Sequence, residues 1–225
     1  YSEGRLFAAT GQGSLAAFDA ASGAVLWQKT GQPPFRSAPI ISGGKLFVIT
    51  IDSQLFAINA ASGDILWSHR GIDETAGLMN AVSPVVSGDT VIVPYESGEL
   101  YALSAIDGSE LWNTALVSGA KRTQADAIFS GIGGDPVVDG QVVLAASSGG
   151  MFAVFGMIQG QRLWERPIAS INSPGISGDY VFALTSDNTL VAMVKYDGRI
   201  RWATQLPSFE DEENKRRPIF WRGPV

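Results

Sequence analysis

Cysteine is absent from the 225 residues, and histidine occurs once, as His69. Without cysteine the chain can form no disulfide, thiolate zinc site, iron–sulfur cluster or cysteine nucleophile. A Ser–His–Asp triad would have to use His69, which ends a predicted outer strand far from any central pocket. We therefore predict that the chain is not an enzyme and has no catalytic, cofactor-binding or metal-binding residues.

Charged residues are also scarce, at 17% of the chain, and the net charge is −6. A protein whose main ligand is nucleic acid needs a basic stripe, so this balance argues against that class of ligand. No apolar run approaches the roughly 18 residues of a membrane-spanning helix. Hydrophobic residues, in contrast, make up 45% of the chain, and 26 glycines indicate many short strands and turns.

A glycine followed four residues later by a tryptophan occurs five times in register. The pairs are Gly23/Trp27, Gly63/Trp67, Gly108/Trp112, Gly160/Trp164 and Gly198/Trp202. An alanine precedes each glycine, at Ala17, Ala57, Ala102, Ala153 and Ala192. Such regularity is typical of a repeat protein, and we predict that the five tryptophans dock each repeat onto the next.

Each repeat is predicted to form four short strands, named a to d. In the second repeat they cover 37–41, 45–51, 54–59 and 64–69, separated by turns rich in Gly, Asp, Asn and Ser. Tryptophan spacings of 40, 45, 52 and 38 residues are typical of propeller blades. The predicted fold is therefore an all-β propeller of four-stranded antiparallel blades, in one domain over 1–225. The repeats cover roughly 1–36, 37–82, 83–134, 135–172 and 173–222.

About five blades are present, and both ends of the chain fall inside a repeat. Residues 1–9 begin at a strand b, and 223–225 match the start of a strand a. Either a five-bladed ring closes through Pro224 and Val225, or the chain is part of a longer propeller. We favour the second alternative, in which the natural N-terminus lies upstream.

Loop lengths indicate which end of the blades is functional. In an up-and-down blade the b–c and d–a links share one end, and the a–b and c–d links share the other. Nearly all length variation falls in the d–a links, which are long at 72–83, 117–135 and 205–222. Because variable loops on a rigid scaffold often carry function, we predict that the d–a end is the binding face.

The repeat Ala-x-Asp-x-x-Ser-Gly-x-x-x-Trp, complete at 17–27, resembles the tryptophan-docking motif of quinoprotein-like (PQQ-type) eight-bladed propellers. The resemblance covers essentially the whole chain. Within that superfamily the loops at 77–84 and 115–136, with the stretches 147–164 and 176–188, are most similar to the BamB family. These proteins are lipoproteins of the outer-membrane β-barrel assembly (BAM) machinery.

The resemblance implies a non-catalytic periplasmic scaffold, anchored to the outer membrane by a lipid on a cysteine upstream of this chain. Its partner would be the POTRA domains of the central barrel-assembly subunit, with nascent outer-membrane polypeptides as a further ligand. Two neighbouring d–a loops would bind the partner. The candidate contact residues are Leu78, Met79, Asn80, Lys121, Arg122, Ile128, Phe129 and Asp135.

This sequence departs from the family at two of these places. Asn80 stands where an arginine is expected, and the second loop keeps only Asp135 of its acidic residues. The apolar side chains could instead pack onto their own blades. Trp221 could lie in the core or on the binding face, and the charge run 210–217 is expected to be a solvated loop.

Two other functions remain possible. A quinoprotein dehydrogenase would bind PQQ and Ca²⁺ on the propeller axis, but its paired cysteines and inner-strand acidic residues have no counterparts here. A propeller that recognises peptide or sugar at the d–a end, or that adds an extended strand to a blade edge, is the third possibility.

Overall fold

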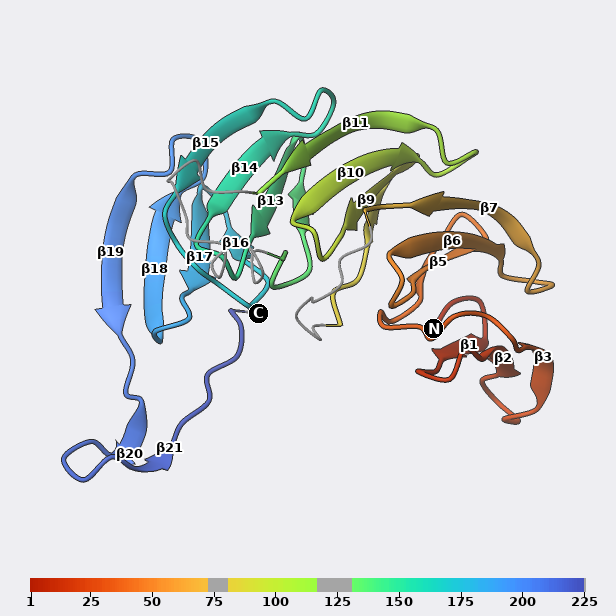
Figure 1. The fold of residues 1–225 in the computed structure, drawn as a ribbon, viewed down its shortest axis with the longest axis horizontal. Helices are drawn as coiled ribbons and strands as arrows, with labels where there is room; N and C mark the ends of the chain where they lie inside the picture. The colour runs from red at the N-terminus through yellow and green to blue at the C-terminus, as the bar shows by residue number, and fades with distance from the viewer. Residues whose placement is uncertain (73–80, 117–130, 225) are drawn as a thin grey trace. The chain divides into compact units, whose positions relative to one another are not determined.

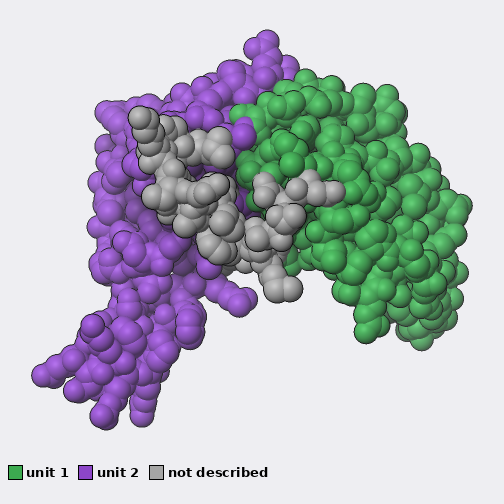
Figure 2. Space-filling view, viewed as in Figure 1, with its two compact units in different colours: residues 1–114 green, residues 115–225 purple. Residues whose placement is uncertain are grey.

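The computed structural model describes residues 1–72, 81–116 and 131–224. All regular structure in these ranges is antiparallel β-sheet, as Figure 1 shows. None of the described residues forms a helix long and apolar enough to cross a membrane. The chain divides into two compact units, 1–114 and 115–225, coloured separately in Figure 2 and described separately below.

The first unit contains three sheets. The first is three-stranded: β1 (Arg5–Ala9), β2 (Leu15–Asp19) and β3 (Val25–Lys29). The second has four strands in sequence order: β4 (Ile40–Ser42), β5 (Lys45–Ile49), β6 (Gln54–Asn59) and β7 (Ile65–Arg70). The third is built in the same way: β8 (Val85–Ser87), β9 (Thr90–Pro94), β10 (Glu99–Ser104) and β11 (Glu110–Ala115).

The second unit contains two more four-stranded sheets and a hairpin. One sheet comprises β12 (Val137–Asp139), β13 (Val142–Ala146), β14 (Phe152–Gly156) and β15 (Arg162–Arg166). The other comprises β16 (Gly175–Ser177), β17 (Tyr180–Leu184), β18 (Thr189–Val194) and β19 (Ile200–Gln205). The hairpin is β20 (Phe209–Asp211) with β21 (Arg216–Pro218).

The predicted a–b–c–d order of strands is confirmed, including entry of the chain at strand b of the first sheet. Strand a is shorter than predicted, with three residues in each four-stranded sheet. A proline stands directly before each of these strands, at Pro39, Pro84, Pro136 and Pro174. Since proline has no N–H to donate, the hydrogen-bonded ladder begins only after it.

The c–d turns have the predicted conformation. The glycines at this position have φ between 66° and 78°, a region that residues with a Cβ rarely adopt. The backbone N–H of Ala21 donates to Asp19 Oδ1 at 3.2 Å, and the N–H of Ala61 donates to Asn59 Oδ1 at 2.8 Å. These bonds fix the tight turn that precedes each tryptophan strand.

The core lies between adjacent sheets within each unit. Leu15 and Phe35 pack against Leu46 and Val48 of the next sheet. In the second unit Leu144 and Phe152 belong to a cluster with Val181 and Met193. Alternate residues of each strand thus face the preceding and following sheets, which is why the apolar content of the inner strands is continuous.

Each of three motif tryptophans lies against the turn glycine of the following sheet. A Cβ on Gly63 would lie 2.7 Å from Trp27, one on Gly108 2.6 Å from Trp67, and one on Gly198 2.5 Å from Trp164. The indole N–H of Trp27 also donates to Ala60 O at 3.0 Å, and that of Trp164 donates to Lys195 O at 2.7 Å. The glycines therefore leave room for a flat ring to contact the turn.

The other two motif tryptophans, Trp112 and Trp202, differ from these three. Trp112 on β11 is 7% exposed, but its expected partner Gly160 belongs to the other compact unit. The docking of Trp112 onto the next repeat therefore stays a prediction. The docking of Trp202 likewise stays a prediction. This side chain on β19 is 45% exposed, and its ring centroid lies 6.0 Å from that of Phe182 on its own sheet.

The expectation of a loop at 210–217 needs correction, because β20 and β21 pair there. The backbone is paired at Phe209–Pro218 and Asp211–Arg216, and Arg217 Nη1 lies 3.1 Å from Glu210 Oε2. The two arms carry opposite charges, and they lack the alternating apolar pattern from which strands are predicted. The prediction that these charges are solvated is confirmed, since most of the hairpin is exposed.

Candidate functional site

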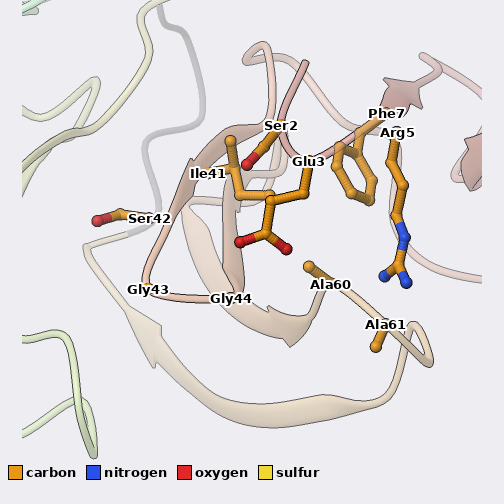
Figure 3. A pocket seen from close by; sticks show the side chains of 10 residues that line it. All are labelled: Ser2, Glu3, Arg5, Phe7, Ile41, Ser42, Gly43, Gly44, Ala60 and Ala61. Carbon is orange, nitrogen blue, oxygen red and sulfur yellow. The ribbon is translucent and has the colours of Figure 1, made fainter. Parts of the chain in front are cut away.

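One cavity of about 290 Å³ lies between the first two sheets of the first unit. Its walls are Ser2, Glu3, Arg5 and Phe7 on one side and 41–44 with 60–61 on the other, as Figure 3 shows. The Glu3 carboxylate points into it. The links 42–45 and 59–65 belong to the a–b and c–d end of the sheet, so this cavity is not at the d–a end.

The d–a end of the first unit contains a polar cluster centred on Tyr95. This side chain is only 1% exposed, and its hydroxyl lies 2.8 Å from His69 Nδ1. The Tyr95 ring lies where a side chain at position 71 would be, since a Cβ on Gly71 would approach it to 2.6 Å. Burial raises the pKa of Tyr95, so the hydroxyl stays protonated and able to donate.

His69, near the end of β7, forms a cluster of three rings with Tyr95 and Tyr101. Its ring centroid is 5.9 Å from that of Tyr95 and 4.8 Å from that of Tyr101. Burial lowers the pKa of His69, and the nearby carboxylates Glu110 and Glu99 only partly offset this effect. His69 is therefore mainly neutral at pH 7 and serves as a hydrogen-bonding partner.

Glu99 connects this cluster to the start of the d–a link. Its Oε2 accepts hydrogen bonds from the backbone N–H of Ile72 at 3.3 Å and from Ser97 Oγ at 3.0 Å. Its Oε1 lies 3.4 Å from the hydroxyl of Tyr101, which donates to it. The last described residues before position 73 are thus held by side chains of the third sheet.

We expect the free energy of unfolding to fall as the pH is lowered from 7 towards 5. Because the folded-state pKa of His69 lies below the ordinary value of 6.5, the unfolded chain binds a proton first and protonation favours unfolding. The stabilisation is therefore complete above pH 6.5 and is lost below it. Urea unfolding at several pH values measures this effect.

The control for this prediction is His69→Gln, which should flatten the dependence between pH 7 and 5. The depressed pKa values of Asp52, Asp64 and Asp107 act in the same direction but only near and below pH 4, because their ordinary value is 3.8. An unchanged slope in His69→Gln would contradict the assignment to His69.

Arg36 forms a buried ion pair across two sheets of the first unit. Its side chain is 7% exposed and pairs with Glu96, which is 18% exposed. The guanidinium also donates to Pro94 O at 3.4 Å, and the backbone N–H of Arg36 donates to Ile49 O at 3.0 Å. The Nε of Arg36 has no hydrogen-bond partner among the residues that the structure describes.

A more exposed polar group follows on the b–c link of the second sheet. Asp52 accepts hydrogen bonds from Thr50 at 2.5 Å and Gln54 at 2.8 Å and lies 3.3 Å from Arg70 Nη2. Burial alone would raise the pKa of Asp52, but the two hydrogen bonds and the arginine together lower it. The described part of this end therefore presents fixed charges of both signs.

In the second unit the d–a link ends in a tightly packed glycine stretch. A Cβ on Gly133 would lie 2.1 Å from Ser170 O, and one on Gly134 would lie 2.2 Å from the backbone N of Ser173. The backbone N–H of Asp135 donates to Ser173 Oγ at 2.9 Å, and the residue is exposed. The glycines thus allow two neighbouring links to pack backbone to backbone.

A protein-family model described as "Outer membrane protein assembly factor BamB" matches residues 1–204. This match covers most of the chain. The chain belongs to the BamB family. A comparison with curated proteins gave no significant match.

Solved structures confirm the propeller fold expected of a BamB-family member. BamB from Moraxella catarrhalis superposes with a TM-score of 0.83 at 24% identity, covering 90% of this chain and 62% of that protein. A europium-containing methanol dehydrogenase superposes with a TM-score of 0.73 at 14% identity, covering 96% of this chain and 52% of that protein. A quinohemoprotein alcohol dehydrogenase from Comamonas testosteroni superposes with a TM-score of 0.71 at 14% identity, covering 96% of this chain and 44% of that protein. The chain thus spans less than two thirds of each of these relatives.

Most of the contact residues predicted for this BamB-family chain lie outside the described residues. These are Leu78, Met79, Asn80, Lys121, Arg122, Ile128 and Phe129. Asp135 is described and lies at an exposed position on the packed glycine stretch. For Trp221 the sequence left two locations possible, the core and the binding face. The side chain is 38% exposed and donates its indole N–H to Pro207 O at 2.8 Å.

Sequence reasoning missed the Tyr95 cluster and the Arg36–Glu96 pair. At the position of Tyr95 the other repeats have Thr10, Thr50, Ser147 and Thr185. Each of these hydroxyls binds the backbone of its own turn. A large aromatic residue in a place otherwise held by small hydroxyl residues was the available signal, because it implies a different local role.

Proposed function

We propose that this chain is a non-catalytic scaffold of outer-membrane protein assembly. It binds the POTRA domains of the central β-barrel assembly subunit at the periplasmic side of the outer membrane, where a lipid anchors the full-length protein. The observation that carries this proposal is the BamB-family match over residues 1–204. Because the chain spans 62% of the Moraxella protein, the proposal concerns the longer protein.

The packing at the d–a end supports the choice of binding face. Glu99 holds Ile72 at the start of the segment 73–80, and Gly133 and Gly134 fix the end of the segment 117–130. The described residues that flank the two segments are thus held on rigid sheets, and variable links on a rigid scaffold often carry function. A few apolar residues surrounded by polar ones, such as Leu78 and Met79, suit the centre of a protein interface.

The quinoprotein dehydrogenases among the structural relatives define the alternative. At 14% identity these matches concern the fold alone. An absorbance titration of the full-length protein with PQQ and Ca²⁺ separates the two functions. Saturable binding would favour the dehydrogenase, whereas a scaffold gives no spectral change.

The experiment for the proposed function is a pull-down of the purified POTRA domains by the double variant Leu78→Asp/Met79→Asp. We expect binding to weaken at least about tenfold, because buried charges replace the apolar anchor at a cost above about 1.4 kcal/mol. The chain should unfold at the same denaturant concentration as the wild type.

The matched control is Ile106→Asp/Ile158→Asp. These isoleucines are 64% and 77% exposed and lie on c–d turns, at the opposite end of their sheets. The control should bind as the wild type does. Normal binding by the Leu78/Met79 variant, or equal loss in the control, would refute the proposed binding face.

A further inference from the structure

The cavity between the first two sheets has a counterpart in the second unit, and there a lysine fills it. Ala60 and Lys195 hold the same position, three residues before the glycine of their c–d turns. Each donates its backbone N–H to the a–b link of its own sheet at 2.9 Å. The Nζ of Lys195 lies 2.8 Å from Asp139 Oδ2 on the preceding sheet and donates to Gly178 O at 2.9 Å. The lysine side chain, which is 12% exposed, thus occupies the space between the sheets.

The exchange of this lysine for alanine opens the cavity in the first unit. The sheet before Lys195 has its strand a, β12, yet the side chain that fills the space comes from the c–d turn. At the same position Ala60 has only a methyl group, and a volume of about 290 Å³ remains empty. The cavity therefore results from the small side chain of Ala60 and not from the place at which the chain begins.

Glu3 holds a backbone position that the other four repeats give to glycine. Its φ is 49°. The glycines at the same place in the a–b link have φ between 55° and 59° and are Gly43, Gly88, Gly140 and Gly178. A residue with a Cβ is strained in this left-handed region, and such strain is concentrated at functional sites. Figure 3 shows that the carboxylate of Glu3 points into the cavity, so the strained position places a negative charge there.

Arg5 adds a positive charge to the wall of the same cavity. It is half-buried at the start of β1, where the equivalent strand β13 of the second unit begins with Val142. Neither Arg5 nor Glu3 forms an ion pair with another residue in the described part of the chain. The first unit thus presents one unpaired group of each sign where the second unit has an internal lysine.

We propose that this cavity binds a small zwitterion, namely an amino acid or a short peptide with a free ammonium and a free carboxylate group. The Glu3 carboxylate and the carbonyl of Gly43 hold the ammonium group, as the equivalent link holds that of Lys195. The guanidinium of Arg5 holds the carboxylate, because its planar fork matches the two carboxylate oxygens.

The volume and the remaining walls agree with a ligand of this size. About 290 Å³ is at the small end for ligand sites, which run from about 300 to 1,000 Å³. Phe7 and Ile41 provide apolar surface for the side chain of the ligand. The cavity lies at the a–b and c–d end, so the proposal is independent of POTRA binding at the d–a end.

Isothermal titration calorimetry of the full-length protein tests the proposal with L-leucine and with two analogues that each lack one charge. Isocaproate lacks the ammonium group of leucine, and isoamylamine lacks its carboxylate. L-Leucine should bind with a Kd of about 1 mM or tighter, and each analogue at least about tenfold more weakly. The dipeptide L-leucyl-L-leucine has its charges further apart, so the tighter binder of the two zwitterions shows whether a free amino acid or a peptide is preferred.

Two variants remove the site in different ways. Glu3→Gly gives this position the residue of the other four repeats, so the fold should be retained while zwitterion binding weakens at least about tenfold. Ala60→Lys supplies the side chain that fills the equivalent space in the second unit and should abolish binding. If Ala60→Lys does not fold, Glu3→Gly alone decides.

Arg5→Val and Lys45→Val form a matched pair for the carboxylate half of the site. Lys45 holds the position of Arg5 in the second sheet and is also half-buried, but it does not line the cavity. Arg5→Val should weaken L-leucine binding to the level of isoamylamine, and Lys45→Val should bind as the wild type does. Absence of binding by both zwitterions, an analogue as tight as L-leucine, unchanged binding in Glu3→Gly, or equal loss in Lys45→Val would overturn the proposal.

Discussion

Replacing Trp164 by alanine is expected to lower the free energy of unfolding by about 3–5 kcal/mol, the range for a buried aromatic residue. Trp164 is 8% exposed, stacks on Phe152 at 5.7 Å and donates its indole N–H to Lys195 O. The truncation would leave a cavity between two sheets and an unpaired carbonyl. Urea unfolding followed by far-ultraviolet circular dichroism measures the loss.

Trp202→Ala is the matched control, because it has the same place in its repeat. Trp202 is 45% exposed and contacts Phe182 on its own sheet. Truncation of Trp202 should lower the free energy of unfolding by less than about 1 kcal/mol, because this half-exposed side chain buries little apolar surface and its removal leaves no closed cavity. Equal losses in the two variants would contradict the docking role assigned to the motif.

The sequence predicted the regular part of this fold well for a physical reason. Strand c of the second repeat was predicted at 54–59 and β6 has those bounds, because alternation and tight turns are both local properties. Strand a was overpredicted because Pro39 interrupts the ladder, and only the structure shows where the hydrogen bonds begin. The turn glycines were predictable because a positive φ leaves few other choices.

The candidate site was much less predictable. The Arg36–Glu96 pair joins positions 60 residues apart, and no local pattern indicates which charges will meet between sheets. The hairpin β20–β21 was missed for a related reason, since its two short strands lack an alternating apolar face. Non-local polar contacts depend on the packing of whole sheets, which the repeat pattern does not encode.

The second large effect is expected at the buried ion pair. Glu96→Ala should lower the free energy of unfolding by about 3–5 kcal/mol, because it leaves the charge of Arg36 without its partner. Arg36 is only 7% exposed, and its Nε already has no hydrogen-bond partner among the described residues, so water cannot readily replace the carboxylate. Thermal or urea unfolding gives the value.

The double variant Arg36→Met/Glu96→Leu decides how this loss is to be interpreted. If the single-variant loss is the cost of an unpaired buried charge, replacing both residues by apolar ones of similar size should restore stability to within about 1 kcal/mol of the wild type.

The exposed pair Arg217–Glu210 gives the scale for a solvated contact. Its side chains are 81% and 59% exposed, so Glu210→Ala should lower the free energy of unfolding by less than about 1 kcal/mol.

The outcome that would contradict this interpretation is an Arg36→Met/Glu96→Leu variant as unstable as Glu96→Ala. It would show instead that the buried ion pair itself stabilises the contact between the second and third sheets. In that case the position of Ile72, which Glu99 holds at the start of the d–a link, would depend on Arg36, and the POTRA binding proposed above should weaken in the double variant as well.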